Sequence, residues 1–508
     1  MHAVVVGAGS AGCAVAGRLA ERGQTVALVE AGPDWRSEAC PEEIRRPPDD
    51  VFAWRVDGRA PSSFASSGVT AERFAGEGQT PYLRGWGMGG TSSLNGLVTI
   101  RPPVDEFAHW VELGCTGWGW EDVLPIFRRL EDDRDYGAAD PDVHGLGGPV
   151  PVVRRDESEW GSGDRLLADA AASAGHPWEP DYHRPGALGF SRTASHIRLG
   201  VRVTAYDGYV EPWRNGGRIA VHPRSLVSRV VVRDGRAVGV AVLAPDGDET
   251  LIEGDEVVLA AGAAATPGIL QRSGIGPAGL LESLGIPVAA DLPVGSGVQD
   301  HVGFWLHVAY DGAVPAANGA RGNVTLRYSS NLDHSRPGDL LVVAANPAVP
   351  GVNETAFGVK LARCVSRGTN RIVSSDPSEP ADIRMRLLSD PNDAELARHA
   401  VRSARELLAP YGTVRDRFGR VVDAVDDDEI DAWMRECARD TSHLTGGAAM
   451  GVDHAAVVDP RLRVRGIRAL TVADLSVCPI VPRANTYLTA VMIGERAADF
   501  LTDMEDAP

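Results

Sequence analysis

The sequence predicts an α/β fold with two domains: a discontinuous domain on a parallel sheet, and an inserted α+β domain built on an antiparallel sheet. Strand–glycine–helix patterns lie at the N-terminus, in the middle and near the C-terminus, and segments of alternating apolar and polar residues separate them. The chain of 508 residues is also too long for one hydrophobic core. We expect residues 1–155, 195–302 and 440–508 in the first domain, and residues 156–194 and 303–439 in the second.

The N-terminal segment has the pattern of a Rossmann-like dinucleotide-binding unit. A short apolar strand at residues 4–6 leads into Gly7–Gly12, which fits G-x-G-x-x-G. In this motif the three glycines allow a tight turn, approach of the backbone to a pyrophosphate, and close packing of helix on strand. A helix over Ala11–Arg22 and a strand over Thr25–Val29 follow. Glu30 then lies 23 residues (30 − 7) after Gly7, near the roughly 20 expected for a carboxylate that holds ribose hydroxyls. The unit alone leaves FAD and NAD open, and a purely structural turn is the alternative.

The rest of the chain alternates between turn-rich and periodic segments. Residues 33–78 predict a long loop or lid, and the Gly- and Ser-rich residues 83–96 predict either a ligand-binding loop or a plain one. Residues 218–242 predict a β-meander, residues 256–261 a buried strand before a second glycine-rich helix entry, and residues 302–386 further strands. Helices are predicted over residues 121–131, 162–174, 393–408, 426–439 and 489–501, with a last strand over residues 469–472.

Charge and composition exclude several classes of protein. A formal charge of −19 lacks the basic face that nucleic acid or an anionic membrane requires, so we expect neither as a partner. No apolar run reaches about 18 residues, so no membrane span is expected. The six cysteines are scattered without a C-x-x-C pair, which predicts neither a disulfide framework nor a zinc site, and no metal is expected. Because the chain also lacks a signal-peptide pattern, we expect a cytoplasmic protein.

Several blocks in fixed order resemble the glucose–methanol–choline (GMC) oxidoreductases, which are FAD enzymes. Arg84–Gly96 resembles the first signature of that family, and Gly262–Pro277 resembles the second nearly position for position. Later blocks of the family resemble Val294–His301, Val458–Val464 and Val472–Ser476. The resemblance covers most of the chain and is weakest over residues 33–78 and 303–365. It implies that the discontinuous domain binds FAD and that the inserted domain binds the substrate.

The resemblance also implies which residues contact FAD. The glycine-rich turn would hold the pyrophosphate, Glu30 the adenosine ribose and Val227 the adenine, whereas the C-terminal block would lie at the flavin end. The residues expected to bind FAD are Gly7, Gly9, Ser10, Ala11, Gly12, Glu30, Ala31, Arg84, Gly89, Gly90, Thr91, Asn95, Gly96, Val227, Ala261, Gly262, Ala473, Asp474, Asn485 and Thr486. Some relatives attach FAD through a histidine before the asparagine of the first signature. Leu94 stands there, so we expect non-covalent FAD.

The family places a histidine, followed some forty residues later by a second histidine or an asparagine, at its catalytic centre. His443 and Asn485 match this pair at a separation of 42 residues (485 − 443). Removing hydride from an alcohol carbon requires alkoxide character, so a base with a pKa near neutrality must take the hydroxyl proton. His443 suits that role, and Asn485 can donate to the developing alkoxide while staying neutral. A helix cap is the alternative role for Asn485.

The chain departs from the family after this histidine. Leu444 stands where proline is usual, and Gly446–Gly451 lacks the usual threonine and arginine, which predicts a smaller and less polar lining. His301, within a family block, is expected to position backbone rather than to catalyse. The other histidines considered are expected to be structural or at the surface: His109, His144, His183 and His399.

The predicted function is FAD-dependent oxidation of a small alcohol to an aldehyde or ketone, with His443 as base and hydride transfer to flavin N5. The His–Asn pair resembles that of the choline-oxidising branch, and candidates for an aromatic cage are Trp54, Trp86 and Trp305. The electron acceptor stays open among oxygen, a quinone and a redox partner. The alternatives are a lyase or decarboxylase type of role on the same fold, and a specialised biosynthetic dehydrogenase that passes electrons to a partner.

Overall fold

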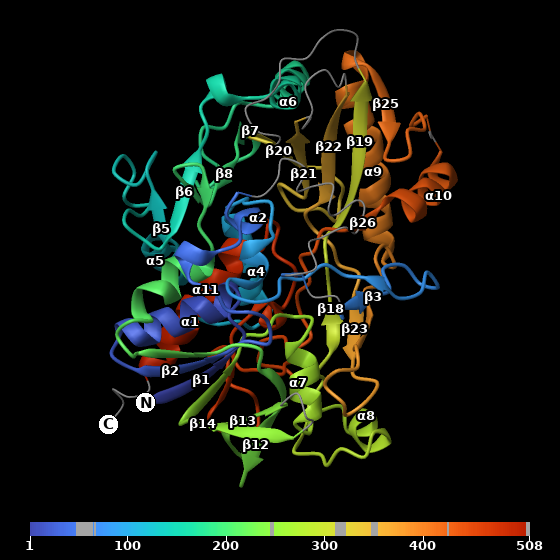
Figure 1. The fold of residues 1–508 in the computed structure, drawn as a ribbon. Coiled ribbons are helices and arrows are strands. Elements are labelled where there is room, and N and C mark those ends of the chain that lie inside the picture. The colour runs from blue at the N-terminus through green and yellow to red at the C-terminus, as the bar shows by residue number, and fades with distance from the viewer. Residues whose placement is uncertain are drawn as a thin grey trace.

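The computed structural model describes residues 1–46, 64–65, 68–243, 248–309, 322–346, 354–423 and 426–503. A parallel sheet lies at one end of the molecule and a large antiparallel sheet at the other (Figure 1). Each sheet belongs to its own cluster of buried apolar side chains. The α/β fold with an antiparallel sheet inserted between parts of a discontinuous parallel one is therefore confirmed.

The parallel sheet has the strand order β11-β2-β1-β15-β27, with all neighbours parallel. Its strands are β1 (His2–Val6), β2 (Thr25–Val29), β11 (Ile219–His222), β15 (Glu256–Leu259) and β27 (Leu470–Val472). Their apolar residues are almost wholly buried, as in a parallel sheet covered on both faces. Helices α1 (Ser10–Glu21) and α11 (Tyr487–Thr502) pack together on one side, and a three-stranded antiparallel sheet lies on the other (Figure 1).

That three-stranded sheet corrects part of the predicted β-meander. It consists of β12 (Leu226–Arg233), β13 (Arg236–Leu243) and β14 (Glu249–Glu253), and the predicted turn at residues 233–236 joins the first two. Residues 219–222 do not belong to it, because β11 pairs in parallel with β2 at the edge of the main sheet. Local alternation of residues cannot reveal such a distant partner, since an edge strand and a meander strand have the same pattern.

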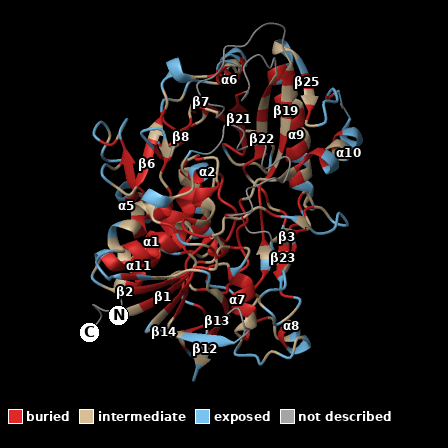
Figure 2. Ribbon diagram, viewed as in Figure 1, coloured by how far each residue is buried: buried red, intermediate tan, exposed pale blue. Residues whose placement is uncertain are grey.

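The large antiparallel sheet has the order β25-β19-β22-β21-β20-β7, and β26 also pairs with β19. Helix α9 (Pro391–Leu408) packs against β22, and α6 (Ser162–Ser173) packs against β20 and β21. Figure 2 shows α9 buried along much of its length, whereas α10 (Asp427–Cys437) is more exposed. The strands are β7 (Gly189–Arg192), β19 (Val302–Ala309), β20 (Val324–Tyr328), β21 (Leu340–Ala345), β22 (Glu354–Leu361), β25 (Thr413–Asp416) and β26 (Arg439–Asp440).

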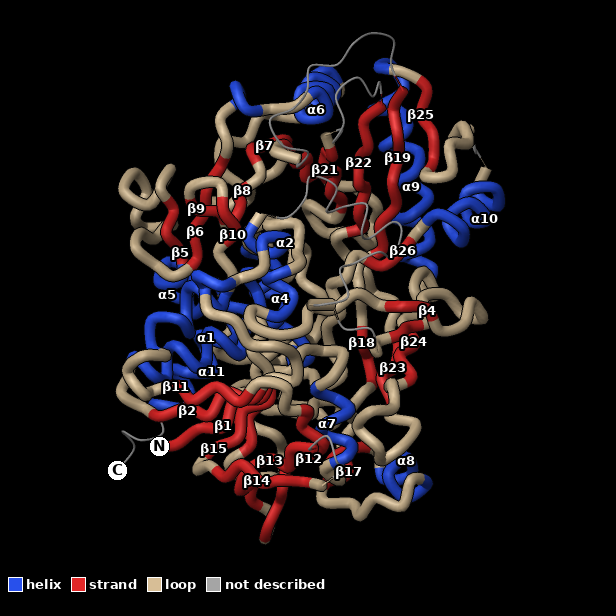
Figure 3. Tube along the Cα trace, in the orientation of Figure 1, coloured by secondary structure: helices blue, strands red, loops and turns tan. Residues whose placement is uncertain are grey.

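Loops fill the region between the two large sheets (Figure 3). The remaining helices are α2 (Glu42–Arg45), α4 (Val104–Glu112), α5 (Trp120–Leu130), α7 (Thr266–Arg272) and α8 (Ala278–Ser283). The remaining strands are β3 (Thr70–Ala71), β4 (Thr80–Pro81), β5 (Glu131–Asp133), β6 (Val150–Arg154), β8 (Ala194–Ser195), β9 (Ile197–Arg198), β10 (Val201–Arg202), β16 (Ile275–Gly276), β17 (Ala290–Asp291), β18 (Ser296–Val298), β23 (Gly368–Arg371) and β24 (Asp382–Arg384). All the predicted helices are present, with ends shifted by a few residues.

The predicted domain limits stay a prediction. Strand β19 begins at Val302, and β18 pairs with β23, so the sheet β18-β23-β24 links residues 296–298 to residues 368–384 across the expected boundary. Much of the predicted loop at residues 33–78 lies outside the described residues. Among the helices described, none is both long and apolar enough to cross a membrane. All six cysteines are free thiols.

Candidate active site

A cavity of about 610 Å³ opens at the carboxyl ends of the parallel strands β1, β2 and β15. Ligands of open α/β sheets bind at this edge. Most of the residues predicted to bind FAD line the cavity together with the predicted catalytic pair: Gly7, Gly9, Ser10, Ala11, Glu30, Ala31, Arg84, Gly90, Thr91, Asn95, Gly96, Val227, Ala261, Gly262, His443, Asp474, Asn485 and Thr486. Three predicted residues do not line it: Gly12, Gly89 and Ala473.

Each of the three motif glycines is required for a different local reason. Gly7 adopts φ +100°, a left-handed conformation that favours glycine. A Cβ on Gly12 would lie 1.9 Å from the carbonyl oxygen of Gly7, so Gly12 serves the packing of α1 on β1 rather than the cavity wall. A Cβ on Gly9 would meet no protein atom within 4 Å. Gly9 therefore presents backbone without a side chain to the cavity. A ligand such as a pyrophosphate can approach such a backbone closely.

Glu30 lines the cavity and also connects three loop segments through hydrogen bonds to its carboxylate. Its carboxylate accepts hydrogen bonds from the backbone N–H groups of Ala8 (2.9 Å), Gly32 (2.8 Å) and Gly87 (3.1 Å). Burial raises the pKa of the Glu30 carboxyl, and these three donors oppose that shift. The sequence predicts only the ribose contact, because the link from Glu30 to Gly87 joins segments 57 residues apart.

The first signature segment packs directly on the glycine-rich turn. Gly90 has φ +51°, and a Cβ there would lie 2.7 Å from the Cα of Gly9. Asn95 is fixed from behind, because its Oδ1 accepts from Arg202 Nη1 (2.6 Å) and is 2.8 Å from His196 Nε2. The backbone of the segment can thus lie along the cavity while its polar side chains hold the loop. Leu94 is buried and does not line the cavity.

Arg84 presents unsatisfied donors at the cavity. Its guanidinium lies over the ring of Tyr82, 4.3 Å from the centroid. Its Nε and Nη2 are buried and have no hydrogen-bond partner among the described residues. Buried guanidinium nitrogens without partners are rare and are the donors that an anionic group would satisfy.

Asp474 ties the C-terminal block to the second signature. Its Oδ2 accepts from the backbone N–H of Gly262 (2.9 Å) and from Thr266 Oγ1 (2.6 Å), and its Oδ1 accepts from Ser476 N (2.7 Å). Burial raises the pKa of this carboxyl. Gly262 adopts φ +86°, and a Cβ there would meet no protein atom within 4 Å. This second bare-backbone position lies on the same cavity as Gly9.

His443 stands on a constrained loop at the cavity. It is 7% exposed, and the residue before it, Ser442, has φ +61°, which is uncommon for a residue other than glycine. Asp300 accepts the backbone N–H of His443 at 3.0 Å and the hydroxyl of Tyr82 at 2.5 Å. Burial raises the pKa of Asp300 to about 7. Non-glycine residues in this backbone region are often found at active sites, where surrounding bonds hold them.

The side chain of His301 contacts that of His443 directly. The two Nδ1 atoms lie 2.9 Å apart, and Thr441 Oγ1 lies 2.8 Å from the same Nδ1 of His443. Burial lowers the pKa of His301 well below its usual range, so this imidazole is neutral. The expectation that His301 does not itself catalyse stays a prediction, and the contact of its side chain with His443 is an addition to it.

Lys360, the sole lysine of the chain, lies beside Asn485. Its Nζ donates to Asn485 Oδ1 at 3.1 Å, from a side chain that is largely buried. The N-cap position of α11 belongs to Thr486, so the capping alternative for Asn485 is not observed. No sequence motif indicates Lys360 as a site residue. The only signal in the sequence is that the chain has no other lysine. Of the tryptophans considered for an aromatic cage, Trp86 lines the cavity, Trp305 does not, and Trp54 lies outside the described residues.

These observations fit the FAD that the resemblance implies. Bare backbone at Gly9 and Gly262 leaves room for a ligand, the unsatisfied nitrogens of Arg84 suit a pyrophosphate, and the cavity runs from Val227 to the His443–Asn485 pair. A dinucleotide laid along that path would have its reactive end near the pair and its adenine end near β12.

Comparison with known proteins agrees with this geometry. Residues 1–303 match the N-terminal part, and residues 365–494 the C-terminal part, of the GMC oxidoreductase family. The chain is 34% identical to 5-(hydroxymethyl)furfural oxidase of Methylovorus sp., covering 98% of this chain and 97% of that protein. It is 31% identical to oxygen-dependent choline dehydrogenase of Pseudomonas putida, covering 99% and 94%. The structure of pyridoxine 4-oxidase from Mesorbium loti superposes with a TM-score of 0.87 at 26% identity, covering 99% of both chains. The chain therefore belongs to the GMC oxidoreductase family and is an FAD-dependent enzyme that oxidises CH–OH groups.

Proposed function

We propose that this enzyme oxidises an uncharged alcohol, with His443 as the base and Asn485 as the donor to the developing alkoxide. The observation that carries the proposal is that both side chains line the same cavity as the glycine-rich turn. Bound FAD would supply the hydride acceptor, and the residues of this chain would bind and orient the alcohol and move its proton.

The contacts of the histidine support its role. Because His443 Nδ1 is already engaged by His301 and Thr441, Nε2 is the ring nitrogen that would take the hydroxyl proton. The neutral His301 does not add a positive charge that would weaken the base. A base positioned in this way contributes about 10²- to 10⁴-fold to the rate of such a reaction.

The contact of Asn485 supports its role and bears on the substrate. A lysine ammonium on Oδ1 polarises the amide, which makes the Nδ2 hydrogens better donors to an alkoxide. The same positive charge repels a cationic substrate. Among the described residues, the acidic side chains that line the cavity are those of Glu30, Glu379 and Asp474. Glu30 and Asp474 are engaged by backbone donors, and Glu379 is exposed. The similarity to 5-(hydroxymethyl)furfural oxidase agrees with an uncharged alcohol.

A panel of alcohols mixed anaerobically with the purified holoenzyme tests this proposal, with the oxidised-flavin absorption band as the signal. We expect 5-(hydroxymethyl)furfural or benzyl alcohol to bleach the band, and choline to leave it unchanged. The variant Lys360→Met should reduce the rate at which uncharged alcohols bleach the flavin band, and should reduce the difference between that rate and the rate with choline. Faster bleaching by choline than by every uncharged alcohol would overturn the substrate class.

Two further properties are proposed with it. Leu94 offers no nucleophile, so FAD should be held without a covalent bond, and acid precipitation should leave the flavin in the supernatant. Flavin that stays on the protein pellet would contradict this. Admitting air to the bleached enzyme separates the acceptors: rapid recovery of the band indicates oxygen, and slow recovery indicates a quinone or a redox partner.

A further inference from the structure

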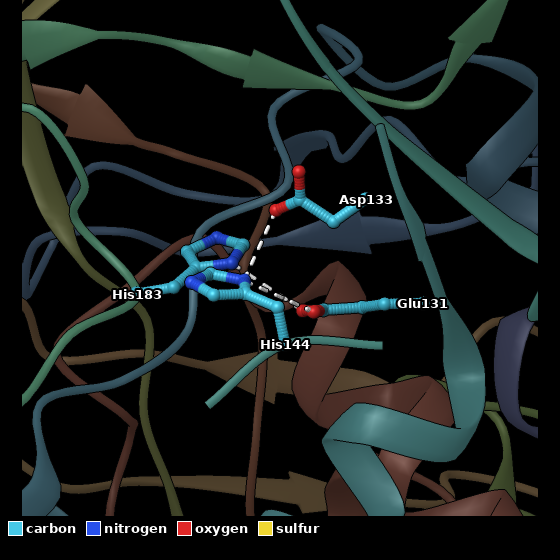
Figure 4. A group of neighbouring side chains, drawn as sticks. All are labelled: Glu131, Asp133, His144 and His183. Carbon is cyan, nitrogen blue, oxygen red and sulfur yellow. Dashed lines mark ion pairs between the residues drawn. The ribbon is translucent and has the colours of Figure 1, made fainter. Parts of the chain in front are cut away.

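A buried cluster of two carboxylates and two imidazoles lies away from the cavity. Glu131 and Asp133 come from β5, His144 from the turn after it, and His183 from the segment before β7. All four are at most 2% exposed, and none lines the cavity. Figure 4 shows their side chains converging, and one ligand atom from each lies within 4.8 Å of the others. We propose that these four residues bind a divalent transition-metal ion, with Zn²⁺ as the best match.

The imidazoles are oriented as metal ligands are. His144 Nε2 lies 2.8 Å from Asp181 Oδ2, and His183 Nε2 lies 2.9 Å from the carbonyl oxygen of Thr99. Because both partners are acceptors, each Nε2 carries a hydrogen, so in the neutral form of each ring the lone pair is on Nδ1. A histidine ligand usually donates its other ring N–H to a carboxylate or a backbone carbonyl in this manner.

The two Nδ1 atoms are buried and make no hydrogen bond with the described residues. His144 Nδ1 faces Asp133 Oδ2 at 3.1 Å and Glu131 Oε2 at 3.8 Å, and His183 Nδ1 faces Glu131 Oε1 at 3.3 Å. Lone pairs that face carboxylate oxygens repel unless a metal ion or a proton lies between them. Ligands placed tetrahedrally at about 2.0–2.1 Å from zinc would be separated by about 3.3 Å. Two of the distances, 3.1 and 3.3 Å, are close to this value, and the third, 3.8 Å, is longer.

The charges of the surroundings leave room for two positive charges. Glu131, Asp133, Asp135 and Asp181 carry four negative charges, and Arg101 and Arg154, which pair with them, carry two positive ones. With both imidazoles neutral, the cluster has a deficit of two, which a divalent cation neutralises. Protonation of both imidazoles would supply the same two charges, so the metal titration below distinguishes the two states.

Two nitrogen and two carboxylate ligands, all buried, form the closed coordination of a structural site rather than an open catalytic one. The ion would join β5 to the segment around His183. His183 is bonded to the carbonyl oxygen of Thr99, and Thr99 follows the signature segment that lines the cavity. The sequence predicted no metal, because residues 131, 133, 144 and 183 have none of the short spacings typical of zinc motifs. Burial and the shared direction of the side chains become visible only in the fold.

Metal analysis of the purified holoenzyme tests the proposal. Protein dialysed against a chelator and then against metal-free buffer should bind one Zn²⁺ per chain in a calorimetric titration, and should melt at a higher temperature with Zn²⁺ than without it. Substituted Co²⁺ should give the visible absorption of a tetrahedral site at wavelengths beyond the oxidised-flavin band. All three measurements use the unmodified chain, so they do not depend on the folding of a variant.

His144→Gln and His183→Gln should each abolish this binding, whereas His454→Gln, which removes an exposed histidine, should leave it unchanged. Absence of saturable Zn²⁺ binding by the unmodified protein would overturn the proposal in favour of protonated imidazoles held among the carboxylates. Equal Zn²⁺ binding by the two cluster variants would overturn it as well, because the ion would then sit elsewhere on the surface.

Discussion

Gly9 and Gly12 belong to one motif, but replacing each by alanine should affect a different property of the enzyme. Gly9→Ala should weaken FAD binding, whereas Gly12→Ala should lower the stability of the fold. Gly9 has φ −80° and ψ −170°, a conformation open to any residue, and its added Cβ would meet no protein atom within 4 Å. Gly9→Ala should therefore leave the stability of the FAD-free protein within about 0.5 kcal/mol of the original. The methyl group would instead occupy space next to the bound pyrophosphate. An overpacking cost of about 1–3 kcal/mol corresponds to roughly 5- to 150-fold weaker FAD binding.

At Gly12 the added Cβ would lie 1.9 Å from the carbonyl oxygen of Gly7 and 3.2 Å from the Cβ of Ala260. Backbone must move to relieve that contact, which places the cost at the upper end of about 1–3 kcal/mol. The helix gains roughly 1 kcal/mol from replacing glycine by alanine, so a net destabilisation of about 2 kcal/mol is expected even without FAD.

The assay uses both variants after removal of FAD. Thermal unfolding of the FAD-free proteins measures the packing cost, and quenching of flavin fluorescence on titration measures the FAD dissociation constant. We expect the Tm of Gly12→Ala to fall by several degrees and that of Gly9→Ala to stay unchanged, while Gly9→Ala loses FAD affinity. A lower Tm for Gly9→Ala than for Gly12→Ala would refute this division of roles.

Three further predictions concern His443, Asp300, which accepts its backbone N–H, and Asp164 of helix α6. His443→Ala should lower anaerobic flavin reduction by about 10²- to 10⁴-fold with FAD still bound; full activity would show that the base lies elsewhere. Since burial raises the pKa of Asp300 from its ordinary value of 3.8 to about 7, the native state holds a proton that the unfolded state has released over this range. Stability should therefore fall as the pH rises from about 4 to about 7, and Asp300→Asn should lack that slope in denaturant melts at several pH values. Asp164→Ala should lower the free energy of unfolding by about 3 kcal/mol or more, because buried Asp164 accepts hydrogen bonds from Gly161, Asn323, Val324 and Asn346 and each buried donor left without an acceptor costs about 1–3 kcal/mol; a cost below about 1 kcal/mol in thermal unfolding would contradict it.

The parts of the fold that could be predicted from the sequence are those with a local cause. The strand–turn–helix at residues 2–21 follows from three glycines at fixed spacing and from apolar strands, each of which acts within a few residues. The helix at residues 391–408 has its own start signal, since the Asp390 side chain accepts from the backbone N–H of Asn392.

The parts that could not be predicted depend on distant partners. Strand β11 takes its place from β2, nearly two hundred residues earlier, and not from its own pattern. The contact of His301 with His443 joins residues 142 apart, and that of Lys360 with Asn485 joins residues 125 apart. Residue types at the site were readable from the chain, whereas the proton and charge relations between them were created by tertiary packing.

The order of strands in the parallel sheet has a consequence for biosynthesis. Strand β1 lies between β2 and β15, and Ala3 pairs with Glu256, so the N-terminal unit lacks one of its neighbours until 253 further residues (256 − 3) have been synthesised. Strand β27 begins another 211 residues (470 − 259) after the end of β15, and Asp474 follows it. Contacts of such long sequence separation form slowly and leave apolar strand surface uncovered in the meantime. The nascent chain should therefore depend on chaperones, and FAD should be captured only after β27 and Asp474 have been synthesised.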